Sequence, residues 1–415
     1  ELDAATLDIS GNADIDGTTN LDAVDIDGTV QIDSTLTVGV DDTGHDVKFF
    51  GATASRHVTW DESADSLILS GNLDVNDGTI KLDGNYPVGT ANVALGDTAL
   101  DSVEAGGTDN TAIGSRAGTT TTTGDRNTVY GSDAYRCNAT ASDNTAVGYQ
   151  AMFCNTSGHN NIAVGNALCK NTSGLYNVAM GSGALSSNTT ASANVGIGRL
   201  ALTANTTGAC NVAIGCCALK SNTTAANNIA VGHDSLKVNT TGADNVAVGA
   251  FSLDANTEGG DNTALGRTSL SSNTTGGENV ALGRSALASN STGCKNVAVG
   301  ASALLLNTTN DNIAVGYQAL EQNTSGTSNI AIGCGALESN TTASDNVAMG
   351  KRALGGTTTG CRNTAIGRTA MNSNTEGDTN VAVGYAALYA NTTADNNTAV
   401  GRSALKANTT GASNT

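Results

Sequence analysis

Apolar and small residues alternate over a five-residue group that recurs along three quarters of the chain. The group reads Asn, then Thr, Val or Ile, then a small residue, an apolar residue and Gly. A new group begins every 17 residues, except that the intervals after Asn161 and Asn296 are 16. A fixed period of this length indicates a repeat architecture rather than a globular domain. The 18 groups start at Asn110, Asn127, Asn144, Asn161, Asn177, Asn194, Asn211, Asn228, Asn245, Asn262, Asn279, Asn296, Asn312, Asn329, Asn346, Asn363, Asn380 and Asn397.

The alternation within each group predicts a short strand, because side chains two residues apart on a strand lie on the same face. The second residue is β-branched and the fourth is apolar in all 18 groups. We predict that both point into the coil, together with the Leu that follows the Gly, as in Ala201-Leu202. The Gly predicts a corner with positive φ. The Asn-Thr-Thr-Gly that ends many units predicts a turn.

One unit buries too few apolar side chains to fold alone, and it is too short for a helical hairpin or a βαβ motif. Stacking solves this problem, because each strand then pairs with its counterparts in the units on either side. The sequence therefore predicts an all-β fold, with a parallel β-solenoid (β-roll) of about 18 coils of 17 residues over residues 92–415. At about 4.8 Å per coil, such a rod would be roughly 85 Å long.

The third residue of the group is Ala in 16 of the 18 copies. Its parity places it on the face opposite to the second and fourth residues, so we predict that it lies on the outside of the coil. An exposed strand position that admits only a methyl group favours close packing against another backbone, most simply that of an identical chain. The alternative is a monomer in which this Ala also faces inward. The predicted interface residues are Ala146, Ala163, Ala213, Ala230, Ala247, Ala264, Ala281, Ala298, Ala314, Ala331, Ala348, Ala365 and Ala382.

The N-terminal part of the chain has a different rhythm. Residues 1–44 contain short alternating segments such as Leu7-Asp8-Ile9, punctuated by glycines. Strands this short bury no core within one chain, so we predict an interwoven β-shaft that three chains share. Residues 45–91 are less repetitive and hold the only tryptophan, Trp60, and are predicted to be an irregular, β-rich connector.

Composition and charge narrow the range of partners. The net charge is −19, and residues 1–90 carry 18 acidic and 3 basic residues. Because no basic stripe is present, we expect no binding to nucleic acid. No apolar run is long enough to span a bilayer, so we expect no membrane insertion.

The repeat resembles a known family. Asn211-Val212-Ala213-Ile214-Gly215, followed by Ala-Leu, is similar to the head repeats of trimeric autotransporter adhesins. Those heads are trimers of left-handed parallel β-rolls built on an Asn-Ser-Val-Ala-Ile-Gly motif, so the resemblance implies a homotrimer of rolls. The present repeat is about three residues longer, which leaves the handedness of the coil open. The N-terminal part, with Phe49-Phe50-Gly51-Ala52-Thr53 and Trp60-Asp61-Glu62-Ser63, resembles the shafts of phage tail fibres.

These patterns predict a structural rather than an enzymatic protein. We expect a segment of a homotrimeric tail fibre or adhesin, located outside the cell on a virion or a cell surface, whose rigid surface contacts host glycans. Two alternatives stay open: a self-assembling extracellular filament subunit, and a polysaccharide-degrading solenoid of the tailspike kind.

The sequence offers little other chemistry. We expect no catalytic residue, cofactor site or metal site, because the four histidines are scattered and the nine cysteines form no CxxC pair. Cys137 and Cys154 lie 17 residues apart, so their side chains are predicted to stack on neighbouring coils. Regular Asn-x-Ser/Thr sequons are interpreted as turn residues with stacked amides, and surface glycosylation is the alternative. These sequons include Asn155, Asn171, Asn188, Asn205 and Asn222.

Overall fold

The computed structural model describes residues 31, 47–50, 57–61, 66–69, 90–104 and 106–415. The predicted shaft over residues 1–44 lies outside the described residues, apart from Gln31. The chain divides into two compact units, residues 1–81 and 82–415. The described residues form strands and turns without any helix, so none of them provides a helical membrane span.

The described part of the first unit is a three-stranded antiparallel sheet in the order β1-β2-β3. Its strands are β1 (Val47–Phe50), β2 (His57–Asp61) and β3 (Ser66–Leu69). Trp60 on the central strand pairs with Val47 on one side and Leu67 on the other. This sheet falls within the segment predicted to be a β-rich connector.

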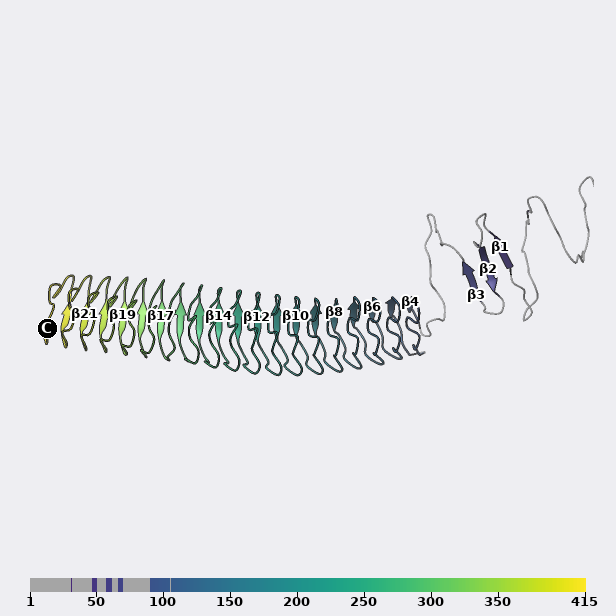
Figure 1. The fold of residues 1–415 in the computed structure, drawn as a ribbon, viewed down its shortest axis with the longest axis horizontal. Coiled ribbons are helices and arrows are strands. Elements are labelled where there is room, and N and C mark those ends of the chain that lie inside the picture. The colour runs from purple at the N-terminus through teal and green to yellow at the C-terminus, as the bar shows by residue number, and fades with distance from the viewer. Residues whose placement is uncertain (1–30, 32–46, 51–56, 62–65, 70–89, 105) are drawn as a thin grey trace, which may run out of the picture. The chain divides into compact units, whose positions relative to one another are not determined.

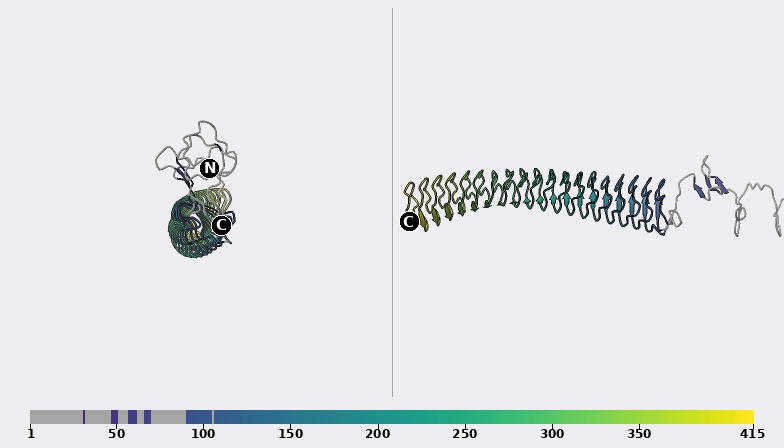
Figure 2. Two further views of the ribbon diagram at one scale, coloured as in Figure 1. Left: turned by 90° about the vertical axis from the view of Figure 1, so that its right-hand side faces the viewer. Right: turned by 90° about the horizontal axis from the view of Figure 1, so that it is seen from below.

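The second unit is a parallel β-solenoid, as predicted, and Figure 1 shows its strands aligned along one side of a long stack of coils. Figure 2 shows the same stack from its end and from below. Each strand is three residues long. The strands are β4 (Val93–Leu95), β5 (Thr111–Ile113), β6 (Thr128–Tyr130), β7 (Thr145–Val147), β8 (Ile162–Val164), β9 (Val178–Met180), β10 (Val195–Ile197), β11 (Val212–Ile214), β12 (Ile229–Val231), β13 (Val246–Val248), β14 (Thr263–Leu265), β15 (Val280–Leu282), β16 (Val297–Val299), β17 (Ile313–Val315), β18 (Ile330–Ile332), β19 (Val347–Met349), β20 (Thr364–Ile366), β21 (Val381–Val383) and β22 (Thr398–Val400).

The register keeps equivalent residues together. Val280 pairs with Val297 and Ala281 with Ala298, and the same relation holds from β4 to β22. Backbone hydrogen bonds run in both directions along the rod, since Val280 N–H donates to Asn296 O and Gly283 N–H donates to Leu265 O, both at 2.8 Å. Each coil is therefore tied to both of its neighbours, which is what a unit without a core of its own requires.

The interior of each coil is small and mixed. We number each coil from its Asn (position 1) to the residue before the next Asn (position 17). In the coil that begins at Asn279, the apolar interior consists of Ala281, Ala286 and Leu287, at positions 3, 8 and 9, all fully buried. The predicted Leu is thus a core residue. The two other residues predicted to be core, at positions 2 and 4, are not part of the buried core cluster.

Two ladders of asparagine complete the interior, one at position 1 and one at position 12. Asn262 Nδ2 donates to Asn245 Oδ1 at 3.1 Å and to Gly276 O at 2.9 Å. Asn273 Nδ2, in the second ladder, donates to Asn256 Oδ1 at 2.8 Å and to the same Gly276 carbonyl at 2.9 Å. Both ladders thus converge on the carbonyl of position 15, and nearly every buried amide finds a partner in its own coil and in the previous one.

Residues with positive φ form the corners of each coil. In the coil of Asn262, Gly266 has φ +140°, while Thr268, Leu270 and Glu278 have φ values of 55°, 50° and 60°. Positions 5, 7, 9 and 17 repeat this pattern in most coils. A non-glycine residue in the left-handed region costs about 1 kcal/mol, so the stacked hydrogen bonds must hold these corners in place.

The two shorter coils each omit one residue at a corner and leave the strand intact. In the coil of Asn161 the missing residue lies between Gly165 and Ala167. In the coil of Asn296 the position-15 residue is missing, and Thr309 O accepts the hydrogen bonds from Asn296 and Asn307 instead. The missing residue interrupts the second ladder. Asn307 Nδ2 donates to Thr309 O, and Asn290 Oδ1 in the preceding coil is left without a hydrogen-bond partner.

A second interruption gives a prediction of increased stability. Thr357 replaces Asn at position 12, and both its hydroxyl oxygen and Asn340 Oδ1 are buried without a hydrogen-bond partner. We expect Thr357→Asn to restore the ladder and raise the opening free energy of these coils by about 1–2 kcal/mol, because a buried unpaired polar atom costs that order of energy. Native-state hydrogen exchange of the amides around residue 357 measures this change.

The matched control is Thr359→Asn, at an exposed position two residues away. It should change the opening free energy by less than about 0.5 kcal/mol. Equal exchange rates in wild type and Thr357→Asn would contradict the ladder as a source of stability.

Candidate interaction face

The outer surface of the parallel sheet is the most unusual surface of the rod. We call the side chains at positions 2 and 4 of the 18 coils, on β5–β22, the sheet face. They are half-buried or exposed while the residue between them is buried, as in Val212 and Ile214 around Ala213. Ile214, Leu265 and Met349 expose 38%, 45% and 39% of their surface. Position 4 is apolar in every coil, and none of the 36 residues of the sheet face carries a charge.

The alanines predicted to form an interface between chains lie on the opposite side of the strands. All are fully buried inside their own coil, so the prediction that they face outward is wrong. Gly196, which replaces this Ala in one coil, shows the reason, because a Cβ added there would lie 3.2 Å from Leu185 Cγ across the interior. The residue is small because a Leu of the same chain faces it. The alanines concerned are Ala146, Ala163, Ala213, Ala230, Ala247, Ala264, Ala281, Ala298, Ala314, Ala331, Ala348, Ala365 and Ala382.

The sequon asparagines are also interior residues. Asn205 Nδ2 donates to Asn188 Oδ1 at 3.0 Å and to Gly208 O at 2.9 Å, and a glycan on that nitrogen would have to occupy the core. The glycosylation alternative is therefore wrong for the folded chain, and the interpretation as stacked amides is confirmed. The fully buried sequon residues are Asn155, Asn171, Asn188, Asn205 and Asn222.

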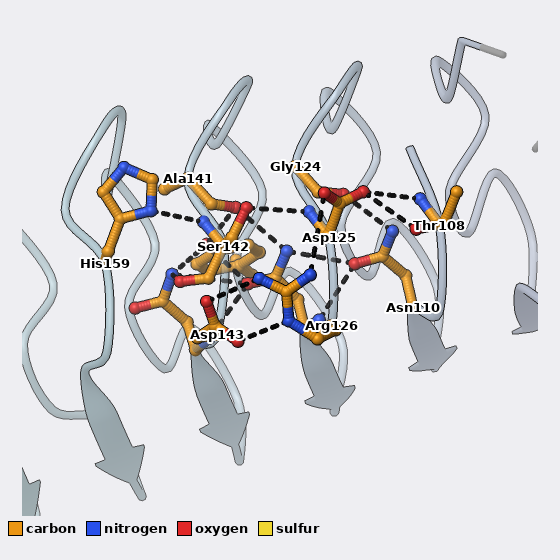
Figure 3. Close-up of polar contacts among 12 residues, drawn as sticks. Thr108, Asn110, Gly124, Asp125, Arg126, Ala141, Ser142, Asp143 and His159 are labelled. Atoms are coloured by element: carbon orange, nitrogen blue, oxygen red, sulfur yellow. Dashed lines mark hydrogen bonds and ion pairs between the residues drawn. The ribbon is translucent and has the colours of Figure 1, made fainter. Parts of the chain in front are cut away.

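A polar ladder at position 16, drawn in Figure 3, has no counterpart in the sequence reasoning. Asp125 Oδ1 accepts the backbone N–H of Thr108 at 2.8 Å, Ser142 Oγ that of Asp125 at 2.9 Å, and His159 Nδ1 that of Ser142 at 2.9 Å. Each side chain thus satisfies a backbone donor one coil back. The available signal was the occurrence of Asp or Ser at position 16 in six of the 18 coils.

Ion pairs within the chain are few among the described residues, and several lie in the first coils. Arg116 Nε lies 2.7 Å from Asp133 Oδ1, and Arg126 Nε lies 2.7 Å from Asp143 Oδ1. The hydrogen bond from Arg116 lowers the pKa of the Asp133 carboxyl group. The partner arginines are well exposed, so these pairs stabilise the fold only slightly.

All nine cysteines are free thiols, and three of them lie on consecutive coils. Burial, followed by the neighbouring Cys137 thiol, raises the pKa of Cys154. Burial, with a smaller effect from Cys154, raises the pKa of Cys169. Cys137 and Cys154 therefore stack on neighbouring coils, as predicted.

The described surface has a notch of about 220 Å³ beside Gly335. Gly335 opens it, because this position carries a side chain in the coils on either side, and Arg352 Nη2 lies 3.8 Å from Glu338 Oε2 across it. It contains no histidine and no pair of buried carboxylates. Among the described residues, no group of three or more His, Cys, Asp or Glu is placed to hold a metal ion.

A comparison of the chain with family models, curated proteins and solved structures finds no match. The most distinctive surface of the chain is the sheet face, which is long, mainly apolar and free of charge.

Proposed function

We propose that this chain is a segment of an extracellular structural fibre, in which three copies associate through their sheet faces and present a rigid outer surface for attachment. One observation carries the proposal: 36 outward side chains on β5–β22 include no charged residue. A strand position that faces water in a lone chain would be expected to accept charged residues such as Lys and Glu, and the sheet face accepts Thr at position 2 in six coils but no charged residue. A mainly apolar surface of this length without charge is typical of an interface.

The size of the sheet face fits a stable assembly. At roughly 40 Å² of exposed surface per side chain, the 36 side chains offer on the order of 1,400 Å² per chain, or about 700 Å² toward each of two neighbours, close to the roughly 800 Å² per partner of a standard interface. This surface is distributed along the whole rod. A partner that covers it must be equally long.

The periodicity of the face supports a second copy of the chain as the partner. The face repeats its features once per coil, so a partner that matches it along its length must repeat at the same spacing. A second copy of the same chain meets this condition without further assumptions, and copies related by rotation about an axis parallel to the rod stay in register throughout. The resemblance of the repeat to the heads of trimeric autotransporter adhesins favours three copies.

Attachment is proposed for the surfaces that remain outside such an assembly. Threonines at positions 13 and 14 form rows along the turns, and Thr257 Oγ1, for example, donates to Thr274 O in the next coil at 3.1 Å. A rigid row of hydroxyl groups at fixed spacing suits weak, multivalent contact with polymeric glycans on a host surface.

The test is the mass and shape of the purified full chain in reducing buffer. Sedimentation and native mass spectrometry should give a species of three times the chain mass of 41.2 kDa, and electron microscopy should show straight rods of uniform width. A monomer at micromolar concentration would overturn the proposal. Open-ended polymers would favour the filament alternative over a closed trimer.

A further inference from the structure

The corners on the two sides of the strands differ in the sign of their charged residues. We call the residue directly before position 1 the leading corner of a coil and position 6 its trailing corner. Of the 18 leading corners, seven are acidic and three are basic, and of the 18 trailing corners, six are Lys or Arg and none is acidic. Two of the three basic leading corners, Arg126 and Arg362, already have carboxylate partners within the chain. Where the corners beside the sheet face are charged, the leading edge is therefore mainly acidic and the trailing edge is basic.

Three coils carry both charges at once. The pairs are Asp261 with Arg267, Glu278 with Arg284, and Asp345 with Lys351, each six residues apart. All six side chains are exposed, and none of them takes part in an ion pair or side-chain hydrogen bond within the described part of the chain. The three-residue strand and its flanking residues separate the two members of each pair, so they cannot meet within one chain.

Rotational symmetry brings these corners together between chains. When identical rods surround an axis parallel to their length, with their sheet faces toward the axis, the strand of one chain ends where the strand of the next begins. At every level the trailing corner of one chain therefore faces the leading corner of its neighbour. The three charge pairs then oppose each other across the boundary, in register, which orients the chains in parallel.

The same two corners carry a pair of thiols in the coil of Asn211. Cys210 is its leading corner and is exposed, and Cys216 is its trailing corner and is partly exposed. Between them lies the extended segment 211–215, which spans roughly 13 Å at about 3.3 Å per residue. A disulfide tolerates a Cα separation of at most about 7 Å, so the two cannot bridge within one chain.

We propose that Cys210 of each chain forms a disulfide with Cys216 of the neighbouring chain, so that three bonds at one level close the ring of chains covalently. This inference rests on the proposed function, since it requires the parallel assembly through the sheet face. The oxidant is a small disulfide such as oxidised glutathione. One protein thiolate attacks it and releases a reduced glutathione, and the second protein thiolate then displaces the other glutathione from the mixed disulfide.

The bond would act as a covalent clamp on an assembly that is otherwise held by apolar contact. Its place is near the middle of the rod, at β11 (Val212–Ile214). The three charge pairs lie in later coils. Their attraction between chains sets the register before the two thiols are oxidised. A disulfide of this kind resists dissociation by dilution, salt and detergent, and those are the conditions that an extracellular fibre meets.

The test is oxidation of the full chain with oxidised glutathione, followed by electrophoresis in detergent without reductant. We expect a covalent trimer that dithiothreitol converts to monomer, and a cross-linked peptide pair containing Cys210 and Cys216 in mass spectrometry. Cys210→Ser and Cys216→Ser should each lower the yield of covalent trimer at least tenfold. Cys334→Ser is the matched control, because Cys334 is also a trailing-corner thiol but its leading-corner counterpart is Ser328. It should leave the yield unchanged.

Three outcomes would overturn the inference. They are a covalent trimer that persists in Cys210→Ser, a bond between Cys216 and Cys217 of the same chain, whose sulfur atoms lie 3.5 Å apart, and a reduced trimer that never cross-links through Cys210. The last outcome leaves the proposed function standing, whereas a monomer in reducing buffer removes both. The variant Asp261→Cys/Arg267→Cys tests the corner geometry separately and should cross-link between chains at a second level.

Discussion

Replacing Gly266 with Ala should break the rod locally and lower the opening free energy of the surrounding coils by about 3–5 kcal/mol, the largest stability loss expected from a single methyl group. Gly266 has φ +140°, and an added Cβ would lie 2.5 Å from Gly283 O and 2.7 Å from Gly283 C in the next coil. Both contacts are with backbone, which cannot move without breaking the hydrogen bonds between coils.

Hydrogen exchange resolved by residue is the appropriate measurement, because a long repeat array does not unfold in one step. The amides of the coils around Gly266 should lose protection, while those near both ends of the solenoid keep it. Gly260→Ala is the matched control in the same region, since Ala209, Ala226 and Ala243 hold the equivalent position in preceding coils. It should change the opening free energy by less than about 0.5 kcal/mol. If the two variants behave alike, the glycine at position 5 is not required by the backbone.

Replacing Val248 with Asp should separate the chains while leaving each coil folded. Val248 lies on the sheet face at the end of β13 and is half-buried in the single chain. In the proposed trimer, three such carboxylates would face one axis out of water, where desolvation and mutual repulsion both oppose association. We expect the dissociation constant to rise by at least about 100-fold, equivalent to about 2.7 kcal/mol.

Sedimentation across a range of concentrations measures this change, and circular dichroism checks that the coils remain folded. Thr241→Asp adds the same charge at an exposed turn position in the preceding coil and should leave the assembly intact. An assembly of Val248→Asp as tight as wild type would show that the sheet face is not where the chains meet.

The candidate site was predictable only in part. The repeat alone predicts that an uninterrupted row of apolar or small residues runs along one face of the rod. The sequence predicted the alanines on the outer face and Val212 and Ile214 in the core, whereas the structure buries the alanines and places Val212 and Ile214 on the outer face. The role of position 16 was also missed, because a side chain that accepts a backbone N–H from another coil leaves no periodicity of hydrophobicity in the sequence.

The sequence by itself determined the architecture. A 17-residue period with a three-residue alternating strand predicts stacked coils, and in this stack the identical units pair in register and in parallel. Only the tertiary structure decided which side of each strand faces inward. The alternation along the strand places Ala213 on the face opposite to Val212 and Ile214. Because both faces are apolar, hydrophobicity does not determine which of them is buried. The choice follows from the left-handed corners and from the narrow interior, in which the side chain at position 9 and two asparagines leave room for a methyl group in most coils, while the coil of Asn127 holds Val129 there.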